Sequence, residues 1–287
     1  ALIIGPGGGR DILLALMGGI GEITAVEVNR ELVDMVGEYA GYNGGIYTDL
    51  DNVEVIVDEG RSFLKRQQEN YDIIMLSLPV TRTSRSLEGF ALTENFIFTT
   101  DSINDYMEHL TDEGSLIVVG HTPLETLRLL SISLVSLKER GITEEEAMKR
   151  IYLVGWEKFP TFVMKKTPFE STELESIHQA ISESEYNSPE LSDINEGRIS
   201  FDDVEELLRR SGSDISPVTD NSPFFYKFQV GIPGPVSLVF WSSIILLLPV
   251  VLIPLMYLRR RPSSRKGRPR DRTGLNKNTL RFVVLFL

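Results

Sequence analysis

The sequence predicts an α/β protein in which a mostly parallel sheet, closed by an antiparallel pair of strands, is followed by a transmembrane helix. Three observations predict this fold class. Apolar runs alternate with helix-patterned stretches over residues 1–120, as in parallel strands joined by helices. Two further apolar runs flank the turn Glu-Lys-Phe-Pro, and no charged residue lies between Lys227 and Arg259.

The apolar runs are the predicted strands, at residues 1–4, 23–28, 53–57, 71–78 and 115–119. Amphipathic stretches predict helices at residues 11–17, 30–39, 61–68, 102–110 and 124–140. Residues 151–156 and 161–165 form the predicted antiparallel pair. Parallel sheets bind ligands at the carboxyl ends of their strands, so we expect the functional site at that edge.

A glycine cluster follows the first strand. Gly5, Gly7 and Gly9 allow a sharp turn and a close approach of a ligand to the main chain. The helix that begins near Arg10 points its first unpaired N–H groups at the same place. This strand–turn–helix predicts that the three glycines bind a nucleotide cofactor, although an ordinary glycine-rich turn has the same local sequence.

An acid ends the second strand. Glu27 follows Gly5 by 22 positions and can accept hydrogen bonds from both hydroxyls of a ribose. The spacing Gly-x-Gly-x-Gly, with Arg10 where a dinucleotide fold has its last glycine, favours a cofactor of the S-adenosylmethionine type. A nicotinamide cofactor is the weaker alternative.

Two acids, Asp58 and Glu59, end the third strand. A carboxylate at this position can accept a hydrogen bond from the adenine amino group, so both are predicted cofactor-binding residues. The alternative is that they form a turn and cap the next helix.

The composition excludes several classes of site and partner. There is no Cys, which excludes disulfides and thiolate metal sites, and His109, His121 and His178 are too far apart to show a metal-ligand spacing. We therefore expect no metal. The net charge is −12, the sum of −21 over residues 1–258 and +9 over residues 259–287. An acidic domain argues against nucleic acid as a partner.

Five segments are predicted. Residues 1–166 form the nucleotide-binding domain, residues 167–230 a polar surface excursion of low order or a lid, and residues 235–258 a transmembrane helix. A basic loop (259–279) and the start of a second span (280–287) follow. The excursion contains helix-like pieces at residues 171–184 and 201–210. We expect an integral membrane protein.

The positive-inside rule places the basic residues 259–281 in the cytoplasm. The acidic domain, one crossing earlier, then lies outside, away from the cytosolic supply of S-adenosylmethionine. Three explanations stay open: a re-entrant apolar segment, upstream spans that override the rule, or a domain that does not use this cofactor.

Several motifs resemble, in order and spacing, those of the spermidine synthase (polyamine aminopropyltransferase) family. They are Gly5-Pro-Gly-Gly-Gly9, Val26-Glu27-Val28, Asp58-Glu-Gly-Arg61-Ser-Phe-Leu64, Tyr71-Asp-Ile-Ile and Leu92-Thr-Glu-Asn-Phe96. The chain is more similar to the membrane-embedded spermidine synthase-like proteins, which carry Thr-Asp-x-x-Pro-Phe-Phe before their C-terminal spans, as residues 219–225 do here. The resemblance covers about residues 1–165 and this segment.

The resemblance implies a Rossmann-like methyltransferase fold that binds S-adenosylmethionine or its decarboxylated form, and a role in polyamine biosynthesis. It implies that Glu27 binds the ribose and Glu59 the adenine edge, with Asp58 beside it.

The chain departs from the family at the catalytic positions. Gly8 replaces an acid of the glycine loop, and Ser77 and Val80 replace the Asp-x-x-Asp pair that helps to bind and deprotonate the attacking amine. A serine hydroxyl is a poor base near neutral pH. Glu94 matches a family position and is the candidate replacement carboxylate, so Ser77 and Glu94 are the predicted catalytic residues.

Two hypotheses remain. In the first, a membrane-anchored transferase moves an aminopropyl or methyl group to an unknown small-molecule acceptor. In the second, a catalytically inactive nucleotide-binding module regulates a membrane protein. Asp220 either faces the pocket or caps a turn, and a homo-oligomer is left open.

Overall fold

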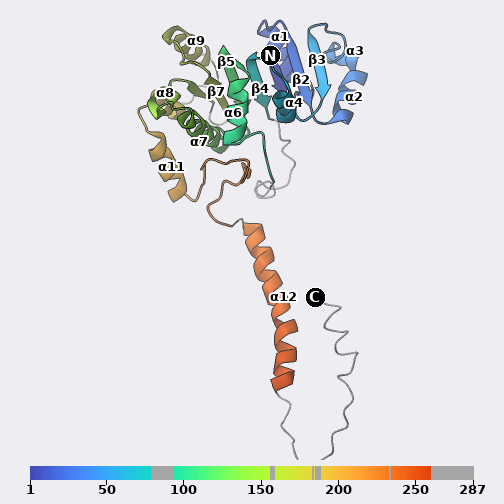
Figure 1. Ribbon diagram of the computed structural model, residues 1–287, viewed down its shortest axis with the longest axis vertical. Coiled ribbons are helices and arrows are strands. Elements are labelled where there is room, and N and C mark those ends of the chain that lie inside the picture. The colour runs from blue at the N-terminus through green and yellow to red at the C-terminus, as the bar shows by residue number, and fades with distance from the viewer. Residues whose placement is uncertain (79–92, 156–158, 183, 185–188, 233, 260–287) are drawn as a thin grey trace, which may run out of the picture. The chain divides into compact units, whose positions relative to one another are not determined.

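The computed structural model describes residues 1–78, 93–155, 159–182, 184, 189–232 and 234–259 (Figure 1). The predicted fold class is confirmed. Seven strands form one sheet in the order β3-β2-β1-β4-β5-β7-β6, with the first five parallel and β7 antiparallel to both of its neighbours. Five parallel strands closed by such a pair are the sheet of the Rossmann-like methyltransferases.

The strands match the apolar runs of the sequence, except that β5 begins at Leu110, five residues before the predicted run 115–119. Their bounds are β1 Leu2–Ile4, β2 Ile23–Glu27, β3 Val53–Val57, β4 Tyr71–Ser77, β5 Leu110–Val119, β6 Ile151–Val154 and β7 Thr161–Lys165. The central strand β1 pairs on both sides, with Leu2 opposite Thr24 on β2 and Ile74 on β4. All three of its residues are buried, as expected for a parallel strand covered on both faces.

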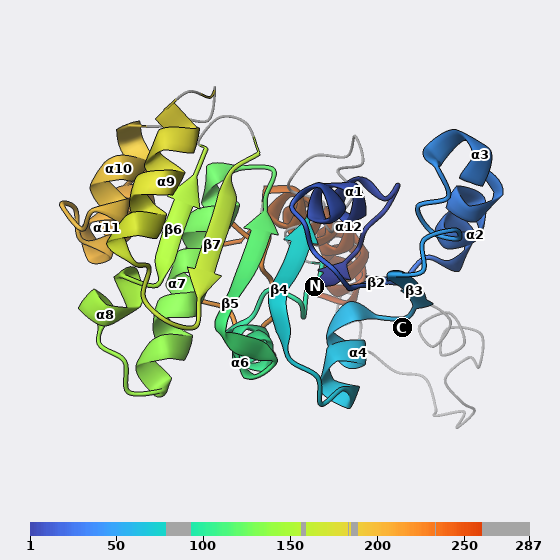
Figure 2. The same ribbon diagram turned by 90° about the horizontal axis from the view of Figure 1, so that it is seen from above.

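Helices cover the two faces of the sheet (Figure 2). α1 (Arg10–Met17) and α2 (Arg30–Glu38) lie on one face, and α4 (Gly60–Arg66), α6 (Thr100–Glu108) and α7 (Pro123–Glu139) lie on the other. The short helices α3 (Ala40–Asn43) and α8 (Glu144–Met148) follow α2 and α7.

Caps fix where two of these helices begin. The side chain of Asn29 accepts from the N–H of Leu32 at the start of α2, and Thr99 and Ser102 form a capping box at the start of α6. The N-termini of α4, α6 and α7 follow strands β3, β4 and β5, so they lie at the carboxyl edge of the sheet.

The polar stretch after β7 contributes to the hydrophobic core, whereas the sequence indicates a surface excursion of low order or a lid. It contains α9 (Ser171–Ser182), α10 (Pro189–Asn195) and α11 (Phe201–Arg210). Leu191, Ile194 and Phe201 are buried in the main core cluster. The amino-acid composition does not reveal this contribution to the core, because each short helix supplies few apolar residues.

The edge strand β6 is covered by a side chain from this stretch. Asn195 accepts from the N–H of Leu153 and donates to its C=O, both at 2.9 Å. The side-chain amide makes the hydrogen bonds that a peptide group of a neighbouring strand would make to this residue. It satisfies two backbone groups that a sheet edge would otherwise leave unpaired.

The chain divides into a compact unit, Ala1–Val236, and a second unit, Ser237–Leu287. Helix α12 (Gly234–Arg259) contains Pro249 and Pro254, and its segment Val236–Met256 has 21 residues with a mean hydropathy of 2.6. Within the described part of the chain, this segment alone is long and apolar enough to cross a membrane. The predicted basic loop and second span lie outside the described residues.

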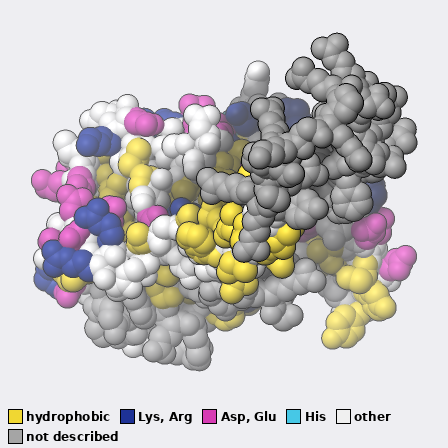
Figure 3. Space-filling view, turned by 90° about the horizontal axis from the view of Figure 1, so that it is seen from below, with side chains coloured by type: hydrophobic (Ala, Val, Ile, Leu, Met, Phe, Trp, Pro, Cys, Tyr) yellow, Lys and Arg dark blue, Asp and Glu magenta, His cyan; other side chains and the backbone are white. Residues whose placement is uncertain are grey.

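Side-chain exposure differs between the two units. The apolar side chains of α12 are largely exposed, for example Leu246 at 73% and Ile253 at 65%. Figure 3 shows acidic and basic side chains interspersed over the compact unit. The interspersed charges indicate an ordinary solvated surface for the acidic unit.

Candidate functional site

The glycine loop makes an open floor at the end of β1. Gly5, Gly7 and Gly9 all have positive φ angles, of 72°, 56° and 87°, which favour glycine. A Cβ atom placed on Gly7 or Gly8 would meet no atom within 4 Å among the described residues, so the space above them is open. A Cβ on Gly9 would lie 2.9 Å from Ile46 Cγ2, because this side of the loop packs against the segment before β3.

Glu27 lies at the end of β2 with its carboxylate turned to this loop. Its Oε2 accepts from the N–H of Gly7 at 3.3 Å and its Oε1 from the N–H of Asn29 at 3.0 Å. The residue is 6% exposed. A carboxylate offers about four acceptor positions, so these bonds orient Glu27 and still leave acceptor capacity for ribose hydroxyls.

Tyr47 belongs to the site and the sequence analysis missed it. Its hydroxyl donates to the C=O of Gly7 at 2.6 Å, across 40 positions of the chain. Burial raises the pKa of Tyr47, and the nearby carboxylates Glu27 and Asp11 raise it further, so the hydroxyl stays a donor at neutral pH. No sequence signal distinguishes this tyrosine from Tyr39 or Tyr42.

Asp11 also belongs to the site and was missed. It lies in the first turn of α1 and is 5% exposed. Burial raises the pKa of Asp11, and Ser77 at the end of β4 lies close enough to offset part of this rise. The structure thus brings the predicted residue Ser77 beside a carboxylate. The sequence offers a weak signal for Asp11, because an acid in the first turn of a helix ordinarily serves the helix dipole.

Asp58 and Glu59 lie at the carboxyl end of β3, where their side chains serve the local turn. Glu59 caps α4 by accepting from the N–H groups of Arg61 at 3.1 Å and Ser62 at 2.7 Å. Asp58 accepts from the N–H of Glu59 and forms an ion pair with Arg66. This is the capping geometry that the sequence analysis left as the alternative. Contact of either acid with adenine stays a prediction.

Gly60 is required for the approach of α4 to the central strand. A Cβ on this residue would lie 2.3 Å from Ile4 Cγ2. The glycine therefore lets the start of α4 pack against β1, next to the loop that carries Gly5.

Glu94 lines a cavity of about 480 Å³ between α4 and the segment before α6. The cavity is lined by Glu59, Arg61, Ser62, Lys65, Glu94, Asn95, Phe96, Ile97 and Asp220. Glu94 is exposed, and the same cavity brings it near the cap residue Glu59. Val80, the other position of the family's acid pair, lies outside the described residues.

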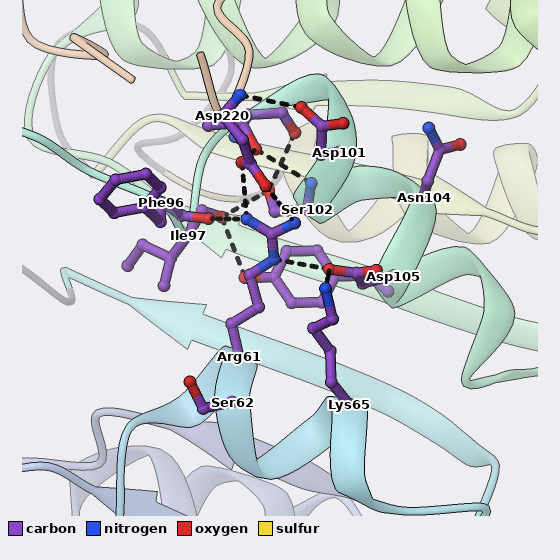
Figure 4. A network of polar contacts seen from close by, with 12 residues as sticks. Arg61, Ser62, Lys65, Phe96, Ile97, Asp101, Ser102, Asn104, Asp105 and Asp220 are labelled. Atoms are coloured by element: carbon purple, nitrogen blue, oxygen red, sulfur yellow. Dashed lines mark hydrogen bonds and ion pairs between the residues drawn. The ribbon is translucent and has the colours of Figure 1, made fainter. Parts of the chain in front are cut away.

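A buried arginine joins α4 to the segment before α12 (Figure 4). Arg61 donates to both carboxylate oxygens of Asp220, at 2.7 and 2.9 Å, and its Nε donates to Asp105 at 2.6 Å. Burial by itself lowers the pKa of Arg61, but the hydrogen bonds to the two carboxylates outweigh it and raise the pKa above its ordinary value. Asp220 also accepts from the hydroxyl of Thr99 at 2.7 Å.

Residues 213–230, which we call the strap, are fixed by a second buried arginine. Arg128 on α7 donates to the C=O groups of Phe225 and Asp214, both at 2.5 Å, and of Lys227 at 2.9 Å. Burial lowers the pKa of Arg128 to about 10, so the guanidinium stays charged at neutral pH. Through Arg61 and Arg128 the strap is held against helices at the carboxyl edge of the sheet.

The residues that the structure describes contain no group of three or more His, Asp or Glu side chains placed to hold a metal ion.

No protein-family model matches this chain, and a comparison with curated proteins gives no match. Solved structures that it resembles are spermidine synthases and methyltransferases. A spermidine synthase in complex with the transition-state analogue AdoDATO has 14% identity and a TM-score of 0.46, over 69% of this chain and 68% of that one. The spermidine synthase of Thermotoga maritima has 14% identity and a TM-score of 0.47, over 69% and 67%. Human methyltransferase-like protein 13 in complex with SAH has 17% identity and a TM-score of 0.43, over 67% and 87%. At these identities the likeness is one of fold.

Proposed function

We propose that the chain is a membrane-anchored transferase that binds S-adenosylmethionine or its decarboxylated form and moves a methyl or aminopropyl group to a small-molecule acceptor. One observation carries the proposal: Glu27 is bonded to the N–H of Gly7 beside the open space over Gly7 and Gly8. An acid held at the end of the neighbouring strand, next to an open glycine floor, is the arrangement that binds the ribose of an adenosine.

The sulfonium cofactor, when bound, supplies a carbon that is activated toward attack by an acceptor's lone pair. The protein's contribution is then chiefly to position the acceptor, with Glu94 as the candidate for receiving its proton. Ser77 ends β4 beside the loop and can orient a polar group of either substrate through its hydroxyl.

The membrane anchor is the apolar segment Val236–Met256. Its 21 residues match the thickness of a bilayer's hydrocarbon core, which a helix of about 20 residues crosses. We expect the chain of residues 1–287 to stay in the membrane fraction after alkaline carbonate washing and to be released by detergent. Reporters active on one side of the membrane, fused to residue 1, will show on which side the domain lies.

Calorimetry on the whole chain, residues 1–287, in detergent micelles tests the nucleotide site. We expect both sulfonium cofactors to bind, and Glu27→Gln to weaken binding about 10- to 100-fold through the loss of charge-assisted hydrogen bonds. The matched control is Glu31→Gln, an exposed acid in the first turn of α2, which leaves affinity unchanged. If neither cofactor binds the wild-type protein, the proposal is wrong.

The second candidate function is a catalytically inactive nucleotide-binding module that regulates a membrane protein. It is favoured by one observation, that Ser77 stands at the end of β4 where the resembled synthases have a carboxylate. Detection of any group transfer that Glu94→Gln abolishes would exclude it.

A further inference from the structure

Two side chains of opposite charge stand side by side at the start of α1, next to the glycine loop. Asp11 is 5% exposed and lies beside Ser77, while Arg10 is exposed and lies close enough to Asp11 for their charges to interact. The guanidinium carbon of Arg10 lies 5.6 Å from the centre of the Phe159 ring, between β6 and β7. The site therefore carries an anion and a cation on consecutive residues.

Neither charged side chain has a partner of opposite charge for all of its hydrogen-bonding positions among the described residues. Among the described residues Arg10 has the ring contact with Phe159 and no ion pair within 4.0 Å. The side chain of Asp11 does not cap α1, and the hydroxyl of Ser77 is a neighbouring polar group. A carboxylate offers about four acceptor positions, so Asp11 retains capacity for a further donor.

The neighbouring backbone also favours an anion. Gly8 is exposed with open space where its Cβ would stand, and it carries no charge where the resembled family has an acid. The unpaired N–H groups at the start of α1 add positive potential at the same place. A ligand group that approaches Gly8 therefore meets the amide groups at the start of α1, and the charged residues Arg10 and Asp11 follow directly after the glycine loop.

The two sulfonium cofactors differ at one end of the molecule. S-adenosylmethionine ends in an ammonium and a carboxylate, whereas the decarboxylated form ends in an ammonium alone. An ammonium is complementary to Asp11 and Ser77. A carboxylate is complementary to Arg10 and the helix N-terminus, and it would be repelled by an acid at position 8.

We propose that Arg10 and Asp11 bind the zwitterionic amino-acid end of S-adenosylmethionine and so select it over the decarboxylated form. This inference rests on the proposed function and names its cofactor and reaction. The group transferred is then a methyl: the acceptor's lone pair forms the new bond to the methyl carbon, and the electrons of the C–S bond pass to the sulfonium sulfur. The acceptor loses its proton to a carboxylate or to water.

Calorimetry with three probes separates this inference from the function on which it rests. The probes are S-adenosylmethionine, its decarboxylated form and 5′-methylthioadenosine, which lacks the amino-acid end. For the wild-type chain of residues 1–287 in micelles we expect S-adenosylmethionine to bind about tenfold or more tightly than the decarboxylated form.

Two variants test which residue binds the carboxylate of the cofactor and which binds its ammonium group. Arg10→Gln should weaken S-adenosylmethionine about tenfold and leave the other two probes unchanged, while Asp11→Asn should weaken both amino-bearing probes and spare methylthioadenosine. Lys138→Gln, which removes an exposed cation from the last turn of α7, is the control and should change none of them.

A thermal melt distinguishes binding from a structural role for Asp11. Burial raises the pKa of Asp11, so its charged form disfavours the fold at neutral pH, and Asp11→Asn should melt at the same temperature as the wild type or higher. A lower melting temperature with weaker binding of all three probes would show a structural residue and overturn the inference.

The remaining outcomes are also decisive. Equal affinity for the two sulfonium cofactors, or tighter binding of the decarboxylated form, overturns the proposed selection of S-adenosylmethionine. Binding of methylthioadenosine in that case still supports the adenosine site. Failure of all three probes to bind overturns the proposed function itself.

Discussion

The strap is the part of the structure whose attachment is most directly testable, through Asp220. This carboxylate accepts two hydrogen bonds from Arg61 and one from the hydroxyl of Thr99, between 2.7 and 2.9 Å. Asp220→Asn keeps the size of the side chain but removes its charge. The buried guanidinium of Arg61 then retains Asp105 and the C=O of Phe96 as partners.

The expected loss of stability follows from these bonds. Removing one partner of a fully buried ion pair costs about 3–5 kcal/mol. The side chain of Asp220 is 39% exposed, so water screens part of the interaction, and asparagine still offers one acceptor oxygen. We therefore expect a loss of about 2 kcal/mol, which for a unit of this size lowers Tm by about 4–8 °C.

The difference in stability between the wild type and Asp220→Asn should change with pH in a definite direction. Burial by itself raises the pKa of Asp220, but the hydrogen bonds from Arg61 and Thr99 outweigh it and hold the pKa below its ordinary value. A depressed carboxyl pKa stabilises the fold above the unfolded-state pKa, about 3.9 for Asp. The difference between wild type and variant should therefore be complete at pH 7 and shrink as the pH falls below about 4.

Circular dichroism melts of the chain of residues 1–287 in micelles measure the effect. The control is Asp202→Asn, an exposed acid in the first turn of α11, for which we expect a change within about 0.5 kcal/mol. If Asp220→Asn melts at the same temperature as this control at pH 7, the strap is not held by the Arg61 ion pair and the reasoning is refuted.

Three further substitutions test the packing around the site by thermal melts. Arg128→Met should destabilise by about 3 kcal/mol, because it leaves buried carbonyls of the strap without a donor; a change below 1 kcal/mol would contradict this. Gly60→Ala should cost about 2–3 kcal/mol, since its Cβ would stand 2.3 Å from Ile4 Cγ2, and an unchanged Tm would show that this contact relaxes freely. Asn195→Ala should cost about 2 kcal/mol by exposing the N–H and C=O of Leu153 on β6; hydrogen exchange at Leu153 should rise with it, and an unchanged rate would count against the pairing.

The fold could be predicted from the sequence because its signals are local. The run Val53–Val57 is a strand in the sequence pattern and in the structure, where this edge strand is half-buried apart from the exposed Glu54. The stretch without charged residues before Arg259 likewise predicts the apolar helix α12 from the local sequence alone.

The candidate site was predicted in part. Glu27 and the glycine loop were paired from strand and loop spacing, which is regular in this type of fold, and the structure joins them through the N–H of Gly7. Tyr47 and Asp11 were missed, because the residues that they contact, Gly7 and Ser77, are far from them along the chain.

The sequence by itself determined the order of strands and helices, the glycine turn and the apolar helix, since each depends on residues a few positions apart. Only the tertiary structure decided that Asp220 pairs with Arg61, 159 positions away, and that Arg128 is buried beneath the strap. Charged residues ordinarily lie at the surface, and an arginine becomes a buried anchor only where distant backbone and carboxylate oxygens converge on it. That convergence is a property of the packed chain, and no local pattern records it.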